Sequence, residues 1–448
     1  MTIAEAEAYL LSLPQFAGRD DAAYRPGLAR VAALLDAMGR PHTACPVIHV
    51  AGTNGKGSTA SMIAAVATAA GRRTGLHTSP HLFRLTERMR LDGVPAPDDW
   101  LAGAVRRFRD TFDAVGPSFF EASVALSFLY FAEAGADLAV VEVGLGGRLD
   151  ATNIVQPALC VVTPIGLDHT ALLGPTHEAI AREKAGILKP GVPVVSGVDH
   201  AGARGVVREV AGALGVPFHH APDEVAVTGA EPALDGVTFD ARTPVRRYAR
   251  LHVGLAGAHQ VHNAVVALRA AELALEAVRE DPAPVFAGLR AVRRLAGLRG
   301  RLEVLGVHPL VVADVAHNAE GLAAALAFVD AHRPPGGRLY ALFGVMRDKD
   351  LPSMARLLAR HHARVLSVRL PGDRALPATA LGEALRRHGV DVLPAIAGTP
   401  AEGLARLRQE AAPGDALLLA GSHQLVAGIP DLPQAAGKPA SAGPRSGG

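Results

Sequence analysis

Short apolar runs alternate with longer segments of helical period along most of the chain from about residue 48 onward. The runs at residues 47–50, 138–143 and 159–162 are apolar almost throughout, as expected of strands that are buried on both faces of a sheet. A helical segment at residues 58–70 follows the first run after a glycine-rich loop. Because strands that alternate with helices form βαβ units, the pattern predicts an α/β fold with a mainly parallel sheet.

The pattern changes twice further along the chain. Residues 220–250 predict antiparallel strands at a sheet edge or in a flap, and a helix is expected at residues 260–275. After a basic, glycine-spaced segment at residues 291–301, strands are expected at 310–315, 338–344, 363–370 and 416–420, with helices at 320–331 and 353–362. We therefore predict a first domain at residues 1–295, a smaller Rossmann-like α/β domain at 296–433 and a disordered tail at 434–448.

Composition and charge narrow the class of protein. The 448 residues are 49% hydrophobic and 20% charged, which suits two well-buried domains. The formal net charge of +2 does not indicate a nucleic-acid or membrane partner. Only Cys45 and Cys160 are present, and they form no disulfide framework. The N-terminal segment is acidic and amphipathic rather than a secretory signal, so a cytoplasmic location is expected.

The segment AGTNGKGS, residues 51–58, lies between a predicted strand and a predicted helix, which is the context of a phosphate-binding loop. Its glycines allow backbone N–H groups to converge on phosphate oxygens, and Lys56 adds a positive charge there. The spacing differs from the common phosphate-loop pattern, because Gly57 stands between Lys56 and Ser58. A glycine-rich turn without a ligand is the alternative, but it leaves the lysine unexplained. We therefore predict that the first domain is a P-loop ATPase domain.

Polar residues follow three of the strand-like runs. Ser79, Glu142 and His169 stand at or after the ends of such runs, and the carboxyl ends of parallel strands meet in one crevice. Together with phosphate oxygens and waters, these three side chains could hold Mg²⁺. Taken singly, each has a plainer explanation: a turn serine, a buried carboxylate with a protein partner, or a structural histidine.

Lys184 lies in an apolar helical stripe with Ile180 and Ile187. A lysine in such a stripe either extends its amine to solvent or loses its charge through burial. A neutral amine can react with carbon dioxide to form a carbamate. Both outcomes remain open for Lys184 at this stage.

Several phrases along the chain resemble the folylpolyglutamate synthase/dihydrofolate synthase family, a branch of the Mur ligase superfamily. They are GTNGKGS (52–58), TSPHLFRLTER (78–88), VEVGLGGRLDATN (141–153), GLDHTALLGPTHEAIAREKAGILK (166–189), HQVHNAVVAL (259–268), GR (300–301) and DVAHNAEG (314–321). They run in family order over about residues 25–425. The resemblance implies an ATP-dependent amide ligase that adds L-glutamate to tetrahydrofolate, and to dihydropteroate, through an acyl phosphate. It also implies small-molecule partners only, and we expect a monomer.

The resemblance also assigns residues to roles. ATP contacts fall on the loop and on three later residues: Thr53, Asn54, Gly55, Lys56, Gly57, Ser58, Asn263, Arg301 and Asp314. Metal ligation by two Mg²⁺ falls on Ser79, Glu142, His169 and a carboxylated Lys184. Catalytic roles fall on Lys56, Lys184, Arg301 and His317, and the incoming glutamate is placed at His317 and Ser422. The folate is placed at Gly27, Leu28, Ser118, Phe119, Phe120, Glu121, Leu149, Asp150 and Ala151.

For some of these residues, the side-chain chemistry itself suggests a role. Arg301 lies in the glycine-spaced segment between the domains, where a guanidinium could stabilise a transferring phosphate when the domains close. Phe119 and Phe120 could stack on a flat heterocycle, although either one is equally well explained as a core aromatic. The phrase Gly421-Ser422-His423 carries His423 where the family more usually has an aromatic residue.

Three other functions are compatible with part of the sequence. A Mur-type ligase of UDP-muramoyl peptides would share the loop, the metal site and the reaction type, but the folate-branch phrases disfavour it. A P-loop kinase or GTPase would turn over nucleotide without an amino acid, and the chain lacks an N-K-x-D base-reading motif. A nucleotide-binding regulator without catalysis would not need the full set of Lys56, Glu142, His169, Lys184 and Arg301.

Overall fold

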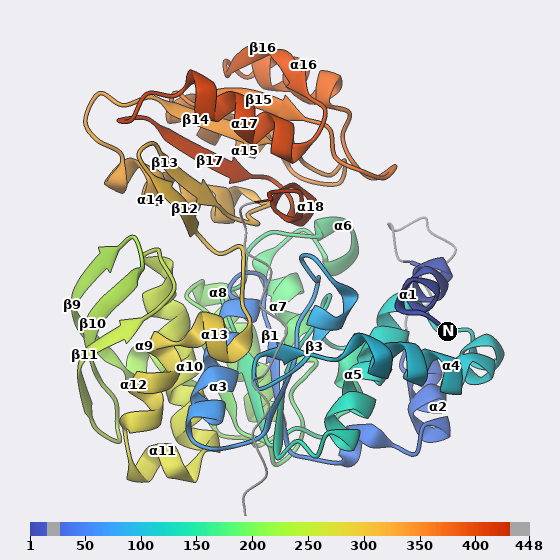
Figure 1. Cartoon of the computed structure of the whole chain (residues 1–448). Coiled ribbons are helices and arrows are strands. Elements are labelled where there is room, and N and C mark those ends of the chain that lie inside the picture. The colour runs from blue at the N-terminus through green and yellow to red at the C-terminus, as the bar shows by residue number, and fades with distance from the viewer. Residues whose placement is uncertain (16–26, 431–448) are drawn as a thin grey trace, which may run out of the picture.

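A computed structural model describes residues 1–15 and 27–430. The chain forms two α/β units, one above the other, with a small antiparallel sheet at the side of the first (Figure 1). The predicted tail at 434–448 lies outside the described residues. The predicted boundary between residues 295 and 296 falls at the last residue of the short helix α13 (Val292–Ala296), shortly before the first strand of the second unit.

The first unit is built on an eight-stranded sheet. Its strands, in spatial order, are β4 (Val94–Pro95), β3 (Met89–Leu91), β2 (Thr74–His77), β5 (Leu138–Glu142), β1 (Val47–Ala51), β6 (Leu159–Val162), β7 (Val194–Ser196) and β8 (Phe218–His220). The six strands from β2 to β8 are parallel, whereas β3 and β4 add an antiparallel edge. The mainly parallel α/β fold is therefore confirmed.

Helices cover both faces of this sheet because its strands are apolar on both sides. One face packs against α3 (Lys56–Ala69) and α10 (His259–Ala274). The other packs against α5 (Phe119–Glu133) at one end and α7 (His177–Ala185) and α8 (Ala201–Ala213) at the other. Beyond α5 lie α1 (Ile3–Ser12), α2 (Ala29–Ala37) and α4 (Asp98–Val115) (Figure 1). The shorter helices are α6 (Thr170–Leu173), α9 (Ala221–Glu224), α11 (Glu276–Glu280) and α12 (Ala283–Arg290).

The expected antiparallel strands form a separate three-stranded sheet rather than an edge of the main sheet. It consists of β9 (Ala226–Ala233), β10 (Gly236–Arg242) and β11 (Arg247–Val253). Its buried face joins the core of the first unit through Phe239 and Leu251, which pack with residues of α10 and α12. It lies at the side of the first unit (Figure 1).

The second unit has a six-stranded sheet in the order β12 (Glu303–Val307), β13 (Leu310–Ala313), β17 (Ala416–Ala420), β14 (Leu339–Phe343), β15 (Arg364–Val368) and β16 (Asp391–Ala397). All neighbours are parallel except β12 and β13. One face packs against α14 (Ala319–His332), α15 (Leu351–Arg360) and α16 (Ala378–Arg387), and the other against α17 (Pro400–Glu410) and α18 (His423–Ala427). The strand expected at residues 310–315 is therefore the second of this unit, because the antiparallel β12 precedes it.

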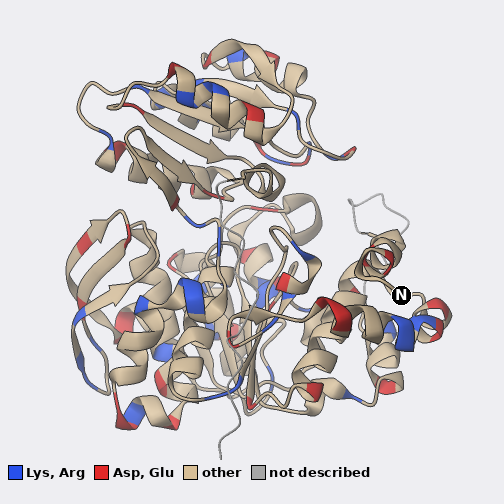
Figure 2. Ribbon diagram, in the orientation of Figure 1, with Lys and Arg blue, Asp and Glu red and all other residues tan. Residues whose placement is uncertain are grey.

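Acidic and basic residues are interspersed along the ribbon of both units (Figure 2). Within the described part of the chain, no helix is long and apolar enough to cross a membrane.

Candidate active site

The phosphate loop joins β1 to α3, as expected. Gly52 and Gly55 have φ values of 153° and 81°, which other residues rarely adopt. A Cβ on Gly52 would lie 1.7 Å from Thr163 Oγ1, and one on Gly55 would lie 2.3 Å from Asn263 Oδ1. The glycines are therefore required by both conformation and close packing. Helix α3 begins at Lys56, so its N-terminal N–H groups face the loop.

The loop is held to the neighbouring strand end. The backbone N–H groups of Thr53 and Asn54 both donate to Pro164 O, at 2.9 and 3.3 Å. Lys56 Nζ donates to Thr53 O at 3.1 Å, so the lysine folds back over its own loop. This arrangement places a positive charge beside a helix N-terminus, where phosphate groups are stabilised.

Glu142 is the last residue of β5 and is 5% exposed. Its Oε2 accepts the backbone N–H of Ser79 at 3.1 Å, which joins two of the predicted metal residues directly. Burial raises the pKa of Glu142, while the charges of Lys56 and Arg301 act in the opposite direction. A Cβ on Gly57 would lie only 3.6 Å from the carboxylate oxygens, so Glu142 closely borders the phosphate loop.

Lys184 is buried on α7 with Ile180, and Ile187 is buried just past the end of this helix. The side chain therefore does not extend to solvent. Its Nζ donates to Gly52 O of the phosphate loop at 2.6 Å. Burial, assisted by the charge of Lys56, lowers the pKa of Lys184 to about 7. A large fraction of the amine is neutral near neutral pH, which is the form that a carbamate requires.

His169 follows β6 and has a φ of 51°, in the left-handed region. Its backbone N–H donates to Asp168 Oδ1 at 2.9 Å. Burial lowers the pKa of His169, so the imidazole is held neutral, which is the form that binds metals. Among residues 1–15 and 27–430, no three His, Cys, Asp or Glu side chains are grouped as a metal site, so Glu142 and His169 would need further ligands.

The second unit contributes residues from the loops that face the first. Arg301 Nη1 donates to Gly300 O at 3.3 Å, and its Nη2 would lie 3.4 Å from a Cβ on Gly57. Asp314 follows β13, and its two oxygens accept the backbone N–H groups of Leu302 and Ala316 at 2.8 and 2.7 Å. The acidic side chain therefore shapes the loop on which it stands. Asn263, in the first domain, lies one turn into α10, which starts at His259.

His317 and His423 lie on the side of the second unit that faces the phosphate loop. His317 Nδ1 lies 2.9 Å from Val315 O, and the two imidazole rings lie 5.4 Å apart between centroids. Burial lowers the pKa of both. Ser422 instead caps α18, since its Oγ accepts the N–H of Gln424 at 3.1 Å. The structure thus places His423, which the sequence alone marked only as a departure from the family, where Ser422 was expected.

A cavity of about 480 Å³ lies between the two units. The predicted ATP and metal residues and His317 all line it: Thr53, Asn54, Gly55, Lys56, Gly57, Ser58, Ser79, Glu142, His169, Lys184, Asn263, Arg301, Asp314 and His317. Ser422 is not part of its wall, whereas Asp168, Glu320 and His423 are.

The nine residues predicted for folate do not line this cavity. Gly27 and Leu28 lead into α2, and the residues directly before them, 16–26, lie outside the described residues. Ser118 and Glu121 cap α5 reciprocally, and Phe119 is a core residue. Phe120 packs against Gly144, whose absent side chain leaves room for the ring. Ala151 is buried, whereas Leu149 is 36% exposed.

Asp150 is 6% exposed and holds the loop that borders the cavity at Gly144 and Leu145. Its Oδ2 accepts Leu145 N–H at 2.9 Å, and its Oδ1 accepts the Thr152 hydroxyl at 2.5 Å. That hydroxyl in turn accepts from His49 Nε2 at 2.9 Å. The structure therefore shows Asp150 in a supporting role, and direct folate binding by these nine residues stays a prediction.

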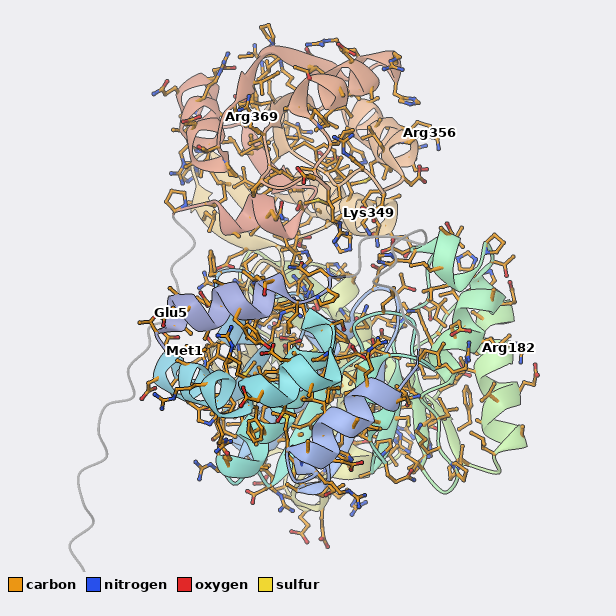
Figure 3. The ribbon with its side chains drawn as sticks, turned by 90° about the vertical axis from the view of Figure 1, so that its right-hand side faces the viewer. Met1, Glu5, Arg182, Lys349, Arg356 and Arg369 are labelled. Atoms are coloured by element: carbon orange, nitrogen blue, oxygen red, sulfur yellow. The ribbon has the colours of Figure 1, made fainter. Side chains whose placement is uncertain are left out.

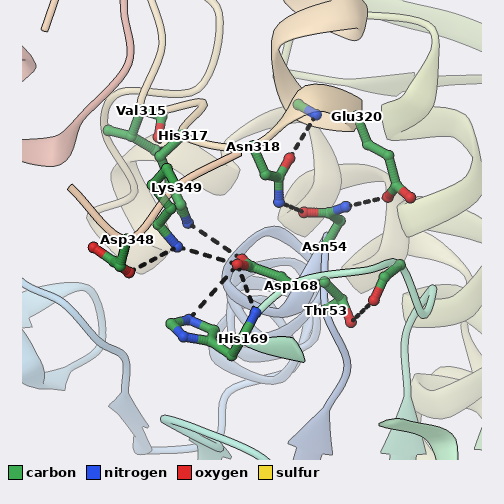
Figure 4. A network of polar contacts seen from close by, with 12 residues as sticks. Thr53, Asn54, Asp168, His169, Val315, His317, Asn318, Glu320, Asp348 and Lys349 are labelled. Carbon is green, nitrogen blue, oxygen red and sulfur yellow. Dashed lines mark hydrogen bonds and ion pairs between the residues drawn. The ribbon is translucent and has the colours of Figure 1, made fainter. Parts of the chain in front are cut away.

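Several polar residues that the sequence did not single out connect the two units (Figure 4). Asn54 Nδ2 donates to Glu320 Oε2 at 2.5 Å, and its Oδ1 accepts from Asn318 Nδ2 at 3.0 Å. Lys349 donates to Asp168 Oδ1 at 3.1 Å. Asn318 and Glu320 follow His317 in one of the phrases that resemble the family, and Asp168 precedes His169 in another. Their place in these phrases could have identified them from the sequence.

The fold and this site define a phosphate-loop enzyme whose nucleotide site is completed by a second α/β domain. The Mur ligase middle domain matches residues 50–271, and the Mur ligase glutamate ligase domain matches residues 300–423. A dihydrofolate synthase/folylpolyglutamate synthase of Bacillus subtilis is 36% identical over 349 residues, which are 76% of this chain and 80% of that protein. The chain belongs to the Mur ligase family.

Solved structures agree over nearly the whole chain. The folylpolyglutamate synthase of Mycobacterium tuberculosis complexed with ADP and AMPPCP superposes with a TM-score of 0.84 at 31% identity and covers 95% of this chain and 97% of its own. The bifunctional folylpolyglutamate synthase/dihydrofolate synthase of Yersinia pestis, complexed with AMPPNP and a Mn ion, has a TM-score of 0.81 at 28% identity, with 95% and 97% covered. Both relatives bind nucleotides, and the Yersinia pestis protein also binds a Mn ion.

Proposed function

We propose that the protein adds L-glutamate to a folate in an ATP-dependent reaction, with tetrahydrofolate as the acceptor for polyglutamylation and dihydropteroate as a second acceptor. The observation that carries the proposal is the cavity, in which Lys56, Glu142, Lys184, Arg301 and His317 line one space between two domains. The names of the relatives support folate as the acceptor.

The first step forms an acyl phosphate. A carboxylate oxygen of the folate attacks the γ-phosphorus of ATP, and ADP leaves. Lys56 and Arg301 are the cations that the cavity offers to the negative charge on the transferred phosphoryl group. The catalytic contribution of these residues is positioning and electrostatic stabilisation, and neither forms a covalent bond with substrate.

The second step forms the amide. The neutral amine of glutamate attacks the acyl carbon, and the tetrahedral intermediate expels inorganic phosphate. His317 holds its proton on Nδ1, which faces Val315 O, so its Nε2 is free to accept the proton that the amine loses. Burial lowers the pKa of His317, and this favours the neutral form that can accept a proton.

The residues present fit Mg²⁺. Burial of Glu142 raises its pKa, and a divalent cation beside it would favour the ionised carboxylate. Ser79, Glu142 and His169 would hold one ion, and a carboxylated Lys184 would support a second. The bound metal neutralises phosphate charge, and magnesium usually completes its coordination with waters and substrate phosphates.

The carbamate on Lys184 is part of the proposal. Neutral Nζ would attack carbon dioxide, form an N–C bond and release one proton. The burial of Lys184 and the nearby charge of Lys56 support this, because both lower the pKa of the amine and so favour its uncharged form. A carbonyl-carbon NMR signal from ¹³C-bicarbonate, present in the wild type and absent in Lys184→Ala, is expected. Full activity of Lys184→Ala would contradict the carbamate.

We further propose that the protein is a cytoplasmic monomer, with domains at residues 1–295 and 296–433.

The decisive assay measures phosphate release from ATP with tetrahydrofolate or dihydropteroate, each with and without L-glutamate. Release should depend on both co-substrates, and mass spectrometry should find the glutamylated product. Comparison of the two acceptors decides whether one or both reactions occur. Lys56→Ala serves as the inactive control. Phosphate release that ignores both co-substrates would contradict the ligase function.

A further inference from the structure

The ammonium of Lys349 lies between the two domains, next to the cavity but outside its wall (Figures 3 and 4). Lys349 stands in the loop between β14 and α15, and its side chain is 9% exposed. Its Nζ lies 3.1 Å from Asp168 Oδ1 of the first domain and 3.9 Å from Asp348 Oδ2. A buried cation requires a counter-charge, and the nearer one comes from the other domain.

Asp168 contacts residues of both halves of the site. Its Oδ1 accepts the backbone N–H of His169 at 2.9 Å, and its Oδ2 lies 3.9 Å from His317 Nε2. The carboxylate is therefore shared by a candidate metal ligand of the first domain and a candidate amino-acid contact of the second.

The two histidines need this carboxylate to be fixed and neutralised. His317 carries a lone pair on Nε2, because its Nδ1 proton faces Val315 O, and a lone pair is repelled by a bare carboxylate. His169 has a φ of 51°, which is uncommon for a residue other than glycine and is supported by the bond from its N–H to Asp168. Lys349 supplies the positive charge that offsets this repulsion at His317, and its bond to Oδ1 holds the carboxylate that supports His169.

We propose that Lys349 is a positioning residue. By neutralising Asp168 across the domain boundary, it fixes His317 relative to His169 and so aligns the amino-acid half of the site with the metal half. The proposal rests on the ligase function proposed above.

The test compares three variants of the full chain in the glutamylation assay. Lys349→Met keeps the length of the side chain and removes the charge, whereas Lys349→Arg keeps the charge. Arg347→Met is the matched control, because Arg347 is an exposed cation of the same loop that bonds to Asp373 O and not to Asp168. In Lys349→Met, kcat/KM for L-glutamate should fall roughly tenfold to hundredfold, as is usual when one partner of a buried charge pair is removed. The Kd for AMPPNP should stay near the wild-type value, although the melting temperature should fall because Asp168 is left without its cation.

Lys349→Arg should recover most of the lost kcat/KM, and Arg347→Met should behave as the wild type. Wild-type kinetics in Lys349→Met would overturn the proposal. So would a loss of nucleotide affinity in parallel with activity, since the role would then be one in folding. A Lys349→Arg enzyme as impaired as Lys349→Met also counts against it. If the wild type itself forms no glutamylated product, the ligase function fails instead.

Discussion

The burial of Lys184 has a consequence for stability that can be measured without any substrate. Its pKa is lowered from 10.5 to about 7 by burial and by the charge of Lys56. Between these two pH values the unfolded chain holds one more proton than the folded protein. Stability of the wild type therefore rises with pH across this window, and the full cost of the buried ammonium is present below about pH 7.

The size of this effect on the free energy of unfolding follows from the two pKa values of Lys184. A difference between 10.5 and about 7 corresponds to about 5 kcal/mol at about 1.4 kcal/mol per pKa unit. Lys184→Met removes this cost but also loses the hydrogen bond to Gly52 O, which contributes about 1–2 kcal/mol. We expect the variant to be about 3 kcal/mol more stable than the wild type at pH 6.5, and this advantage to shrink by about 3 kcal/mol at pH 9.5.

Urea denaturation in metal-free, carbonate-free buffer measures this difference. Trp100 is the single tryptophan and lies on α4 with its ring centroid 4.8 Å from that of Tyr130, so its fluorescence follows the first domain. Arg182→Met is the matched control, because Arg182 is an exposed cation on the same helix (Figure 3). A stability difference that stays constant between pH 6.5 and 9.5 would refute the reasoning. Lys184→Met should at the same time lose glutamylation activity.

Three further outcomes are expected. Glu142→Gln should reduce phosphate release at saturating ATP by about a hundredfold or more, because the buried charge beside Lys56 is lost; near-normal release would contradict this. Asn54→Ala removes two interdomain hydrogen bonds and should raise the Kd for AMPPNP roughly threefold to tenfold by calorimetry, with no change if those contacts are incidental. Ser422→Ala should lower the free energy of unfolding by about 1 kcal/mol without changing KM for L-glutamate, whereas His423→Ala should raise that KM. The reverse pattern would assign Ser422 to the amino acid.

The sequence predicted those elements whose apolar runs are long enough to be distinctive. The strands at residues 159–162 and 416–420 are correct to the residue, since each is buried on both faces. Strands β7 and β8 were missed because each has only three residues, too few for a period to show. Strand β12 was missed because it directly follows the basic, glycine-spaced segment at residues 291–301 and its short apolar run is interrupted by Gly306.

The residues of the candidate site were likewise predictable only where a short stretch of sequence is distinctive. Gly52, Gly55 and Lys56 could be identified because loop conformation and phosphate binding both constrain a short stretch of sequence. The role of Lys349 could not, because its partner Asp168 lies 181 residues away and an isolated lysine in a loop has no distinctive pattern. The same holds for His423, whose neighbour His317 belongs to another loop.

The hydrogen bonds of Asn54 to Asn318 and Glu320 form a bridge between the phosphate loop and the second domain, and this bridge also affects the rate of turnover. Asn54 reaches Asn318 and Glu320 through only two hydrogen bonds, each of which contributes about 0.5–1.5 kcal/mol net. If product release requires the two domains to separate, these two hydrogen bonds break once in each cycle. Contacts this weak reopen within the microsecond-to-millisecond range of domain motions. A tighter bridge, for example a salt bridge at Asn54, would improve closure but delay product release.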